Sequence, residues 1–207
     1  MILPSVSTNA FAGPVIGVAA AGSALAAWLG PGPAATAAMT VALGLVGARI
    51  VWQDLTDFTI PDAATLALGL LGLTSRISEG AVLAEPMGTV LGLALLDAAL
   101  CGGVLLALRE LYYRTRGRDG VGLGDVKLAA VGGLLLGTNG LSWAILGASL
   151  AGLAAVLAAR AWPGALRWFP VTDRIAFGAV LAPSLWATWL LGQIAPTGLS
   201  ESWLGGF

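Results

Sequence analysis

Long apolar stretches, separated by short polar or glycine- and proline-containing connections, make up most of this chain. A helix needs about 20 predominantly apolar residues to cross a bilayer, and most of these stretches approach that length. They predict seven membrane-spanning helices, at Ala12–Leu29, Ala34–Trp52, Ala63–Thr74, Met87–Leu108, Val126–Leu136, Leu141–Ala159 and Ala176–Ile194. The third and fifth stretches are short, so we expect those helices to include flanking residues. The pattern predicts an all-α, polytopic membrane protein in which residues 1–207 form a single integral membrane domain.

The composition favours the same class. The chain is 57% hydrophobic and only 10% charged, and its 30 glycines lie mainly among alanine, leucine and valine. A soluble domain of this size could not bury so much apolar surface, whereas small residues allow membrane helices to pack closely. The residues from Met1 to Ser5 contain no lysine or arginine. The first apolar stretch is therefore interpreted as a membrane span and not as a cleavable signal peptide.

Charge and cysteine content exclude several function classes. A formal net charge of −1 indicates no polyanionic partner, and no segment resembles a nucleic-acid-binding module. The single cysteine, Cys101, rules out an intrachain disulfide. Because the chain also has no histidine, a Cys/His zinc site is excluded. We expect neither a metal ion nor an organic cofactor.

The basic residues predict the orientation of the chain. Counted through seven spans, nine of the ten lysines and arginines fall on one face of the membrane, and only Arg76 falls on the other. An excess of basic residues marks the cytoplasmic face, so the N-terminus is expected inside and the C-terminus outside. The same count places Asp54, at the end of the second span, and Asp125, at the start of the fifth, on the cytoplasmic side.

These two aspartates are candidates for chemistry, because an acidic side chain at the mouth of a membrane helix is costly to place there. Aspartates hydrolyse a peptide bond as a pair that shares one proton across a water molecule. One carboxylate acts as the base, while the other, protonated, polarises the carbonyl. Asp125 follows Gly122 and Gly124, which permit unusual backbone angles and close approach of a substrate. The sequence predicts a carboxylate pair if the helices bring Asp54 and Asp125 together.

Each of these residues also has a plainer interpretation. An acid at a helix end is commonly a solvated boundary residue, and Asp125 would suit the first turn of a helix, where negative charge favours the dipole. Asp57 and Asp62 lie close to Asp54, and the residue types alone do not select among the three. The glycines could simply serve helix packing.

Two motifs resemble signatures of the bacterial type IV prepilin peptidases, which are polytopic aspartic proteases of the GxGD class. The first is the run from Arg114 to Leu128, which contains Gly-Leu-Gly-Asp-Val-Lys near its end. The second is Asp54, five residues, then Ile-Pro-Asp, and this spacing selects Asp54 over its acidic neighbours. The run Arg174–Gly178 resembles the start of the family's last helix. The resemblance extends from about Arg49 to Leu191.

The resemblance implies a membrane aspartic endopeptidase that cleaves the leaders of type IV prepilin-like proteins, including pilins and pseudopilins. Cleavage would occur at the cytoplasmic face of the bacterial inner membrane, in a type IV pilus or type II secretion system. Family substrates carry a short basic leader ending in glycine, followed by a hydrophobic helix. Asp54 and Asp125 would be catalytic. The supporting or substrate-binding motif residues would be Gly122, Gly124, Lys127, Ile60 and Pro61.

The chain departs from the family pattern in two ways. Many bacterial members carry an N-terminal domain with paired CxxC motifs that methylates the new N-terminus, and this chain has no CxxC. We therefore expect cleavage without N-methylation. The second motif ends in Asp62 where asparagine is common, and Asp57 stands where basic residues are common. We expect these acids to alter the preference for basic leaders without affecting the aspartate pair.

Two other charged residues and two rival functions remain open at this point. Lys127 could adjust the Asp125 carboxylate or hold a leader carbonyl, or it could be a lysine that extends to the membrane interface. Asp97 lies about 18 Å along its helix from Arg109, so a packing or capping role is expected.

A presenilin-like protease shares GxGD, but Ala182-Pro183-Ser184 replaces its last-helix Pro-Ala-Leu motif. A small proton-coupled transporter could use the same acids as a relay.

Overall fold

The structure, a computed structural model, describes residues 12–29, 32–117, 120–161 and 176–194. This part of the chain folds into six α-helices and contains no β-strand. They are α1 (Ala12–Leu29), α2 (Pro33–Asp57), α3 (Asp62–Val82), α4 (Met87–Arg116), α5 (Leu123–Ala161) and α6 (Phe177–Ile194). The prediction of an all-α protein is confirmed.

Four of these helices, α2, α4, α5 and α6, are long and apolar enough to cross a membrane. Much of the surface that they expose is also apolar, and α4 is the clearest case: Ala94, Cys101 and Gly102 are its buried residues, while Leu93, Leu96 and many similar residues are exposed. So extensive an apolar surface is unfavourable in water and favourable against lipid tails. The chain is an integral membrane protein, as predicted.

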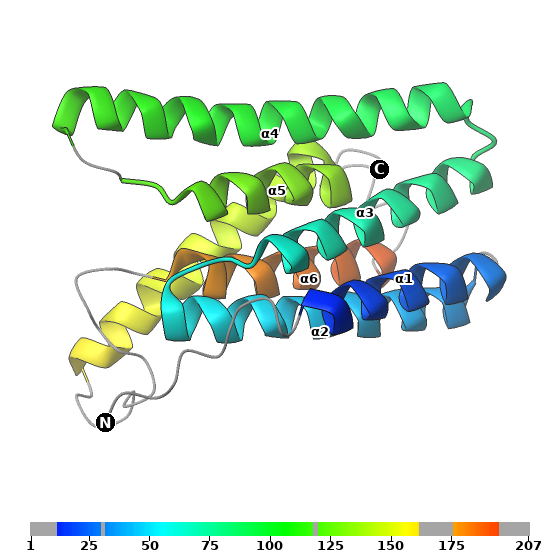
Figure 1. Ribbon diagram of the computed structural model, residues 1–207, viewed down its shortest axis with the longest axis horizontal. Coiled ribbons are helices and arrows are strands. Elements are labelled where there is room, and N and C mark those ends of the chain that lie inside the picture. Colours follow the sequence, from blue (N-terminus) through cyan, green and yellow to red (C-terminus); the bar gives the residue numbers. More distant parts are fainter. Residues whose placement is uncertain (1–11, 30–31, 118–119, 162–175, 195–207) are drawn as a thin grey trace.

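The longest helix, α5, is interrupted at Gly137. This residue has φ 70° and ψ 176°, a conformation that is open essentially only to glycine. Beyond it, the second part of α5, drawn in yellow, runs back toward the end of the molecule where α5 begins (Figure 1). The predicted spans Val126–Leu136 and Leu141–Ala159 therefore correspond to the two parts of α5. The predicted total of seven spans is not confirmed by the described helices.

A partly buried ion pair lies at this interruption. Arg76 of α3 approaches Asp97 of α4, with Nη2 and Oδ2 2.7 Å apart, and the two side chains are 15% and 20% exposed. Arg76 Nε also donates a hydrogen bond to the carbonyl of Leu134, at 3.3 Å. Carbonyls just before a helix break lack a partner one turn on, so Arg76 caps the first part of α5. The expected packing or capping role of Asp97 agrees with this arrangement.

We expect this ion pair to stabilise the fold. Arg76→Met or Asp97→Leu alone leaves an unpaired charge in apolar surroundings and should lower the free energy of unfolding by about 2 kcal/mol. The double variant removes both charges and should be more stable than either single variant. Thermal unfolding in detergent measures this difference. If the double variant loses as much stability as the two single variants together, the two side chains do not stabilise one another.

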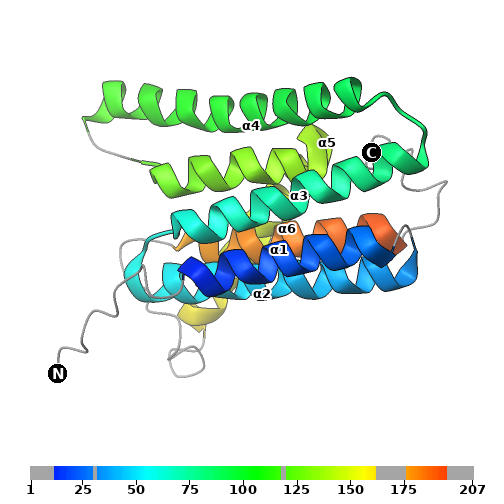
Figure 2. The same ribbon diagram turned by 45° about the vertical axis from the view of Figure 1, so that its right-hand side comes forward.

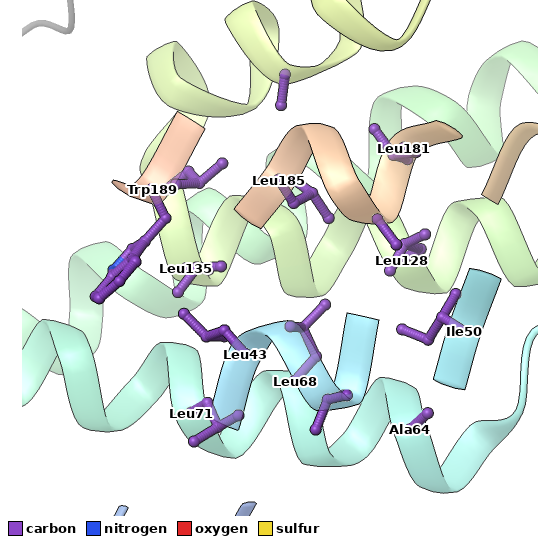
Figure 3. Close-up of a cluster of buried hydrophobic side chains, with 14 of the residues drawn as sticks. Leu43, Ile50, Ala64, Leu68, Leu71, Leu128, Leu135, Leu181, Leu185 and Trp189 are labelled. Carbon is purple, nitrogen blue, oxygen red and sulfur yellow. The ribbon is translucent and has the colours of Figure 1, made fainter. Parts of the chain in front are cut away.

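The core lies between α2, α3, α5 and α6 (Figure 3). It is built mainly from leucine and alanine side chains, with Trp189 at one end. The labelled members include Leu43 and Ile50 of α2, Leu68 and Leu71 of α3, Leu128 and Leu135 of α5, and Leu181 and Leu185 of α6. Helix α1 packs against α2 and α3, whereas α4 lies at one edge of the bundle, against α5 (Figures 1 and 2).

This arrangement brings four helix ends, including those that carry the two aspartates, to one end of the bundle. The end of α2 and the beginnings of α3, α5 and α6 all lie on the left in Figure 1. Asp54 lies in the last turn of α2, and Asp125 in the first turn of α5. The core therefore brings together two sequence regions that are distant along the chain.

Candidate active site

Asp54 is held by the beginning of a different helix. It is buried, at 5% exposed, and its Oδ2 accepts a 2.7 Å hydrogen bond from the backbone N–H of Ala179 in the first turn of α6. The backbone N–H of Gly178 also bonds to this carboxylate. The first N–H groups of a helix have no partner within the helix and lie at the positive end of its dipole. Burial disfavours a charge on Asp54, whereas these N–H groups favour it.

Asp125 lies in the first turn of α5 and is partly buried. Its carboxylate accepts a hydrogen bond from the backbone of Gly122. A Cβ atom on Gly122 would lie only 3.2 Å from Asp125 Oδ2, so the loop passes close to the carboxylate at this point. The Gly122 carbonyl accepts the N–H of Val126 at 3.3 Å, which ties the glycine to the start of the helix.

Ile60, in the connection between α2 and α3, links the surroundings of the two aspartates. A Cβ atom on Gly124, next to Asp125, would lie 3.0 Å from Ile60 Cβ. A Cβ atom on Gly178 would lie 2.7 Å from Ile60 Cδ1 and 3.0 Å from Asp54 Oδ2. The beginnings of α5 and α6 therefore pack against the same side chain, and a Cβ atom at either glycine would crowd Ile60.

The two carboxyl groups are close enough for their negative charges to repel one another. When two carboxylates interact in this way, ionisation of the second is disfavoured while the first is charged. A pair of this kind can hold one proton between its members. This arrangement can supply a base and an acid at the same place, as aspartic hydrolysis needs.

A strained turn positions Ile60. Helix α2 ends with Phe58 in the left-handed conformation, at φ 52° and ψ 34°, which is unusual for a bulky residue. The Phe58 N–H donates to the Asp54 carbonyl at 3.1 Å. Gln53 Nε2 donates a long, 3.4 Å hydrogen bond to Thr59 Oγ1. Pro61 is the N-cap of α3, and a proline disfavours a helical conformation of the residue before it, so α3 does not extend back to Ile60. The turn is therefore fixed on both sides of Ile60.

Lys127 lies near this end of the bundle, and its ionic partner is Asp62. The two groups are 2.6 Å apart and join the beginnings of α5 and α3. Their side chains are 53% and 79% exposed, so the ion pair contributes at most about 1 kcal/mol to stability. The structure gives Asp62 a partner at the position where the motif commonly has asparagine. Asp57 is exposed at the last residue of α2.

Sequence reasoning did not assign Ala179 or Gln53 to this site, because both contacts depend on helices that meet in three dimensions. The signal for Gly178 was the resemblance of Arg174–Gly178 to the start of the family's last helix. Arg174 and Ile175 in that run, and residues 118 and 119 in the first motif, lie outside the described residues. Within the described ranges, no group of three or more histidine, cysteine, aspartate or glutamate residues is arranged to hold a metal ion.

Comparison with known proteins identifies the family. The family model for the type IV leader peptidase family matches residues 41–157, a segment that contains both motifs. Prepilin leader peptidase/N-methyltransferases from Burkholderia pseudomallei strains 1026b and K96243 are each 32% identical over 171 residues, covering 80% of this chain and 50% of theirs. The chain thus spans about half the length of these relatives. No solved structure shows significant similarity. This chain belongs to the type IV leader peptidase family.

Proposed function

We propose that this protein is a membrane aspartic endopeptidase that removes the leader peptide from type IV prepilin-like substrates, with Asp54 and Asp125 as its catalytic residues. Family membership and the prepilin leader peptidase activity in the names of the two relatives support the reaction. The observation that carries the proposal is the meeting of the two carboxyl groups beside Ile60, although 71 positions separate them in the sequence.

In the proposed reaction, one carboxylate takes a proton from a water molecule whose oxygen attacks the scissile carbonyl carbon. The other, protonated carboxyl group donates to the carbonyl oxygen, so charge on the tetrahedral intermediate is reduced. The intermediate collapses, the C–N bond breaks, and the leaving nitrogen takes up a proton as the amine forms. Gly122 is exposed and has no side chain, so a substrate backbone can approach Asp125 from that side.

The direct test uses purified protein in detergent with a prepilin-type substrate that has a basic leader, a terminal leader glycine and an apolar helix. We expect one cut directly after that glycine, read by mass spectrometry. With S-adenosylmethionine present, the new N-terminal amine should stay unmethylated, because the chain's single cysteine cannot form paired CxxC motifs. Product one methyl group heavier would contradict this second expectation. No cleavage, together with proton flux into liposomes that contain the protein, would favour the transporter instead.

We also propose that the site faces the cytoplasm across a bacterial inner membrane. The nine-to-one distribution of basic residues supports this orientation. Arg118, Arg167 and Arg174, and the side chain of Arg160, lie outside what the structure describes. Among the described residues, Arg109, Arg114 and Arg116 lie in the last two turns of α4, whose end is on the same side as the beginning of α5 (Figure 1).

The orientation predicts the labelling of single cysteines in a Cys101→Ala background. Thr115→Cys, near the end of α4, should be protected from a membrane-impermeant thiol reagent in intact cells. Glu85→Cys, in the exposed connection between α3 and α4, should be labelled. Both positions should react after the cells are broken, which controls for accessibility. The reverse pattern would place the aspartates outside, where a cytoplasmic leader could not reach them.

A further inference from the structure

The two aspartates have different surroundings, and the difference bears on their chemical roles. Asp54 accepts hydrogen bonds from two successive N–H groups, those of Gly178 and Ala179, at the beginning of the 18-residue helix α6. Asp125 accepts one, from Gly122 of its own loop. N–H donors aimed at a carboxylate favour its charged form. Helix α5 also favours a charge on Asp125 through its dipole, and Asp54 is the more buried of the two residues, which by itself disfavours its charge. What favours a charge on Asp54 over one on Asp125 is therefore the number of N–H donors and the second helix that supplies them.

The donors to Asp54 are held firmly. Gly178 is buried, and a Cβ atom there would meet both Ile60 and the Asp54 carboxylate, so the start of α6 packs closely against both. Ala179 is also buried. Two N–H groups fixed in this way favour the carboxylate without any rearrangement during the reaction.

The geometry points to a division of roles in which Asp54 is the ionised general base and Asp125 is the protonated general acid. The backbone N–H groups of Gly178 and Ala179 in α6 position the Asp54 carboxylate and stabilise its ionised form. This inference rests on the proposed function. Asp54 takes the proton from the attacking water. Asp125 donates its proton to the carbonyl oxygen, which gives an intermediate with two hydroxyl groups. When the C–N bond breaks, the proton held by Asp54 passes to the leaving nitrogen, and Asp125 takes back a proton from one of the hydroxyl groups as the carbonyl re-forms.

Other ionisable groups at this end of the bundle must be considered in any pH measurement. Helix α2 contributes Arg49 and Asp57, α3 contributes Asp62, and α5 contributes Lys127. The end of α4 contributes Arg109, Glu110, Tyr112, Tyr113, Arg114 and Arg116. Asp62 is paired with Lys127, and Arg109 donates to the carbonyl of Val121 at 3.0 Å. Neither α1 nor α6 contains an ionisable side chain. Asp57→Asn and Asp62→Asn variants therefore serve as controls for carboxyl groups outside the pair.

The test removes one N–H group and changes no side chain. Replacing Ala179 by its α-hydroxy acid, lactic acid, through semisynthesis converts the donating N–H into an ester oxygen. The matched control places lactic acid at Ala182, which lies in the same helix about one turn beyond Ala179. The acidic limb of the kcat/KM–pH profile reports the group that must be ionised, and the alkaline limb reports the group that must be protonated.

We expect the ester at 179 to move the acidic limb upward by about one pH unit, because an ionised Asp54 has lost a donor, while the alkaline limb stays in place. The ester at 182 should leave both limbs unchanged. Ala179→Pro also removes this N–H group, and the proline ring displaces the Asp54 carboxylate. This variant should likewise move the acidic limb upward. An upward shift of the alkaline limb instead, or no shift in either variant, would overturn the division of roles while leaving the peptidase activity established. A wild-type protein that cleaves no substrate would instead refute the proposed function.

Discussion

Asp54→Asn and Asp125→Asn are each expected to lower kcat for leader cleavage at least about a thousandfold, because neither half of the pair can act alone. Asparagine keeps the size of the side chain but cannot take up or release the proton. The double variant should be about as inactive as either single variant, since the two groups act as a unit. Cleavage of a co-expressed prepilin, followed by the mobility of the product on a gel, measures the effect.

Asp57→Asn is the matched control, because it makes the same change three residues away at an exposed position of α2. It should retain most of the activity. All three variants should remain in the membrane fraction in equal amounts, which separates loss of chemistry from loss of protein. An inactive Asp57→Asn together with an active Asp54→Asn would show that the spacing of the motif has been assigned to the wrong aspartate.

Gly178→Ala is expected to lower kcat about a hundredfold while KM changes little. The added Cβ would lie 2.7 Å from Ile60 Cδ1 and 3.0 Å from Asp54 Oδ2, so either Ile60 or the carboxylate must move. A displacement of about 1 Å at a reacting group is enough for a loss of this size. Steady-state kinetics with a purified substrate separates the effect on kcat from an effect on binding.

The partner in this clash can be identified by a second substitution. Ile60→Val removes Cδ1, the atom nearest to the new Cβ, and should restore part of the activity of Gly178→Ala. Gly103→Ala is the control, because a Cβ at this position of α4 meets nothing within 4 Å. It should cleave like the wild type. No recovery in the double variant would assign the whole effect to the Asp54 carboxylate and none of it to Ile60.

The ion pair of Asp62 and Lys127 changes the interpretation of the unusual second motif. Taken from the sequence alone, Asp57 and Asp62 add two negative charges near the site and imply a changed preference for basic leaders. Lys127 lies 2.6 Å from Asp62, so the charge of Asp62 is locally matched. An altered leader preference would therefore depend more on Asp57 than on Asp62.

The class of this protein and its candidate aspartate pair could be predicted from local sequence patterns. Apolar length and small-residue composition specify membrane helices, because backbone polar groups in lipid must be satisfied within each segment. These are local properties, and each predicted span coincides with a helix or with one part of α5, although α3 and α4 each extend eight residues beyond the predicted end. The choice of Asp54 over Asp57 came from the spacing to Ile60 and Pro61, which is also local, and it needed the resemblance to the family.

The surroundings of the two aspartates depend on how the helices pack and could not be predicted from the sequence. The N–H groups at the beginning of α6 reach Asp54 across 125 positions of sequence, and Ile60 lies between two glycines from different helices. The interruption at Gly137, capped by Arg76 of α3, likewise depends on side chains supplied by another helix. Such contacts arise when helices pack in a particular register, and no local pattern encodes that register. The sequence therefore determined which carboxyl groups are present, and the packing decided which donors and which neighbours they meet.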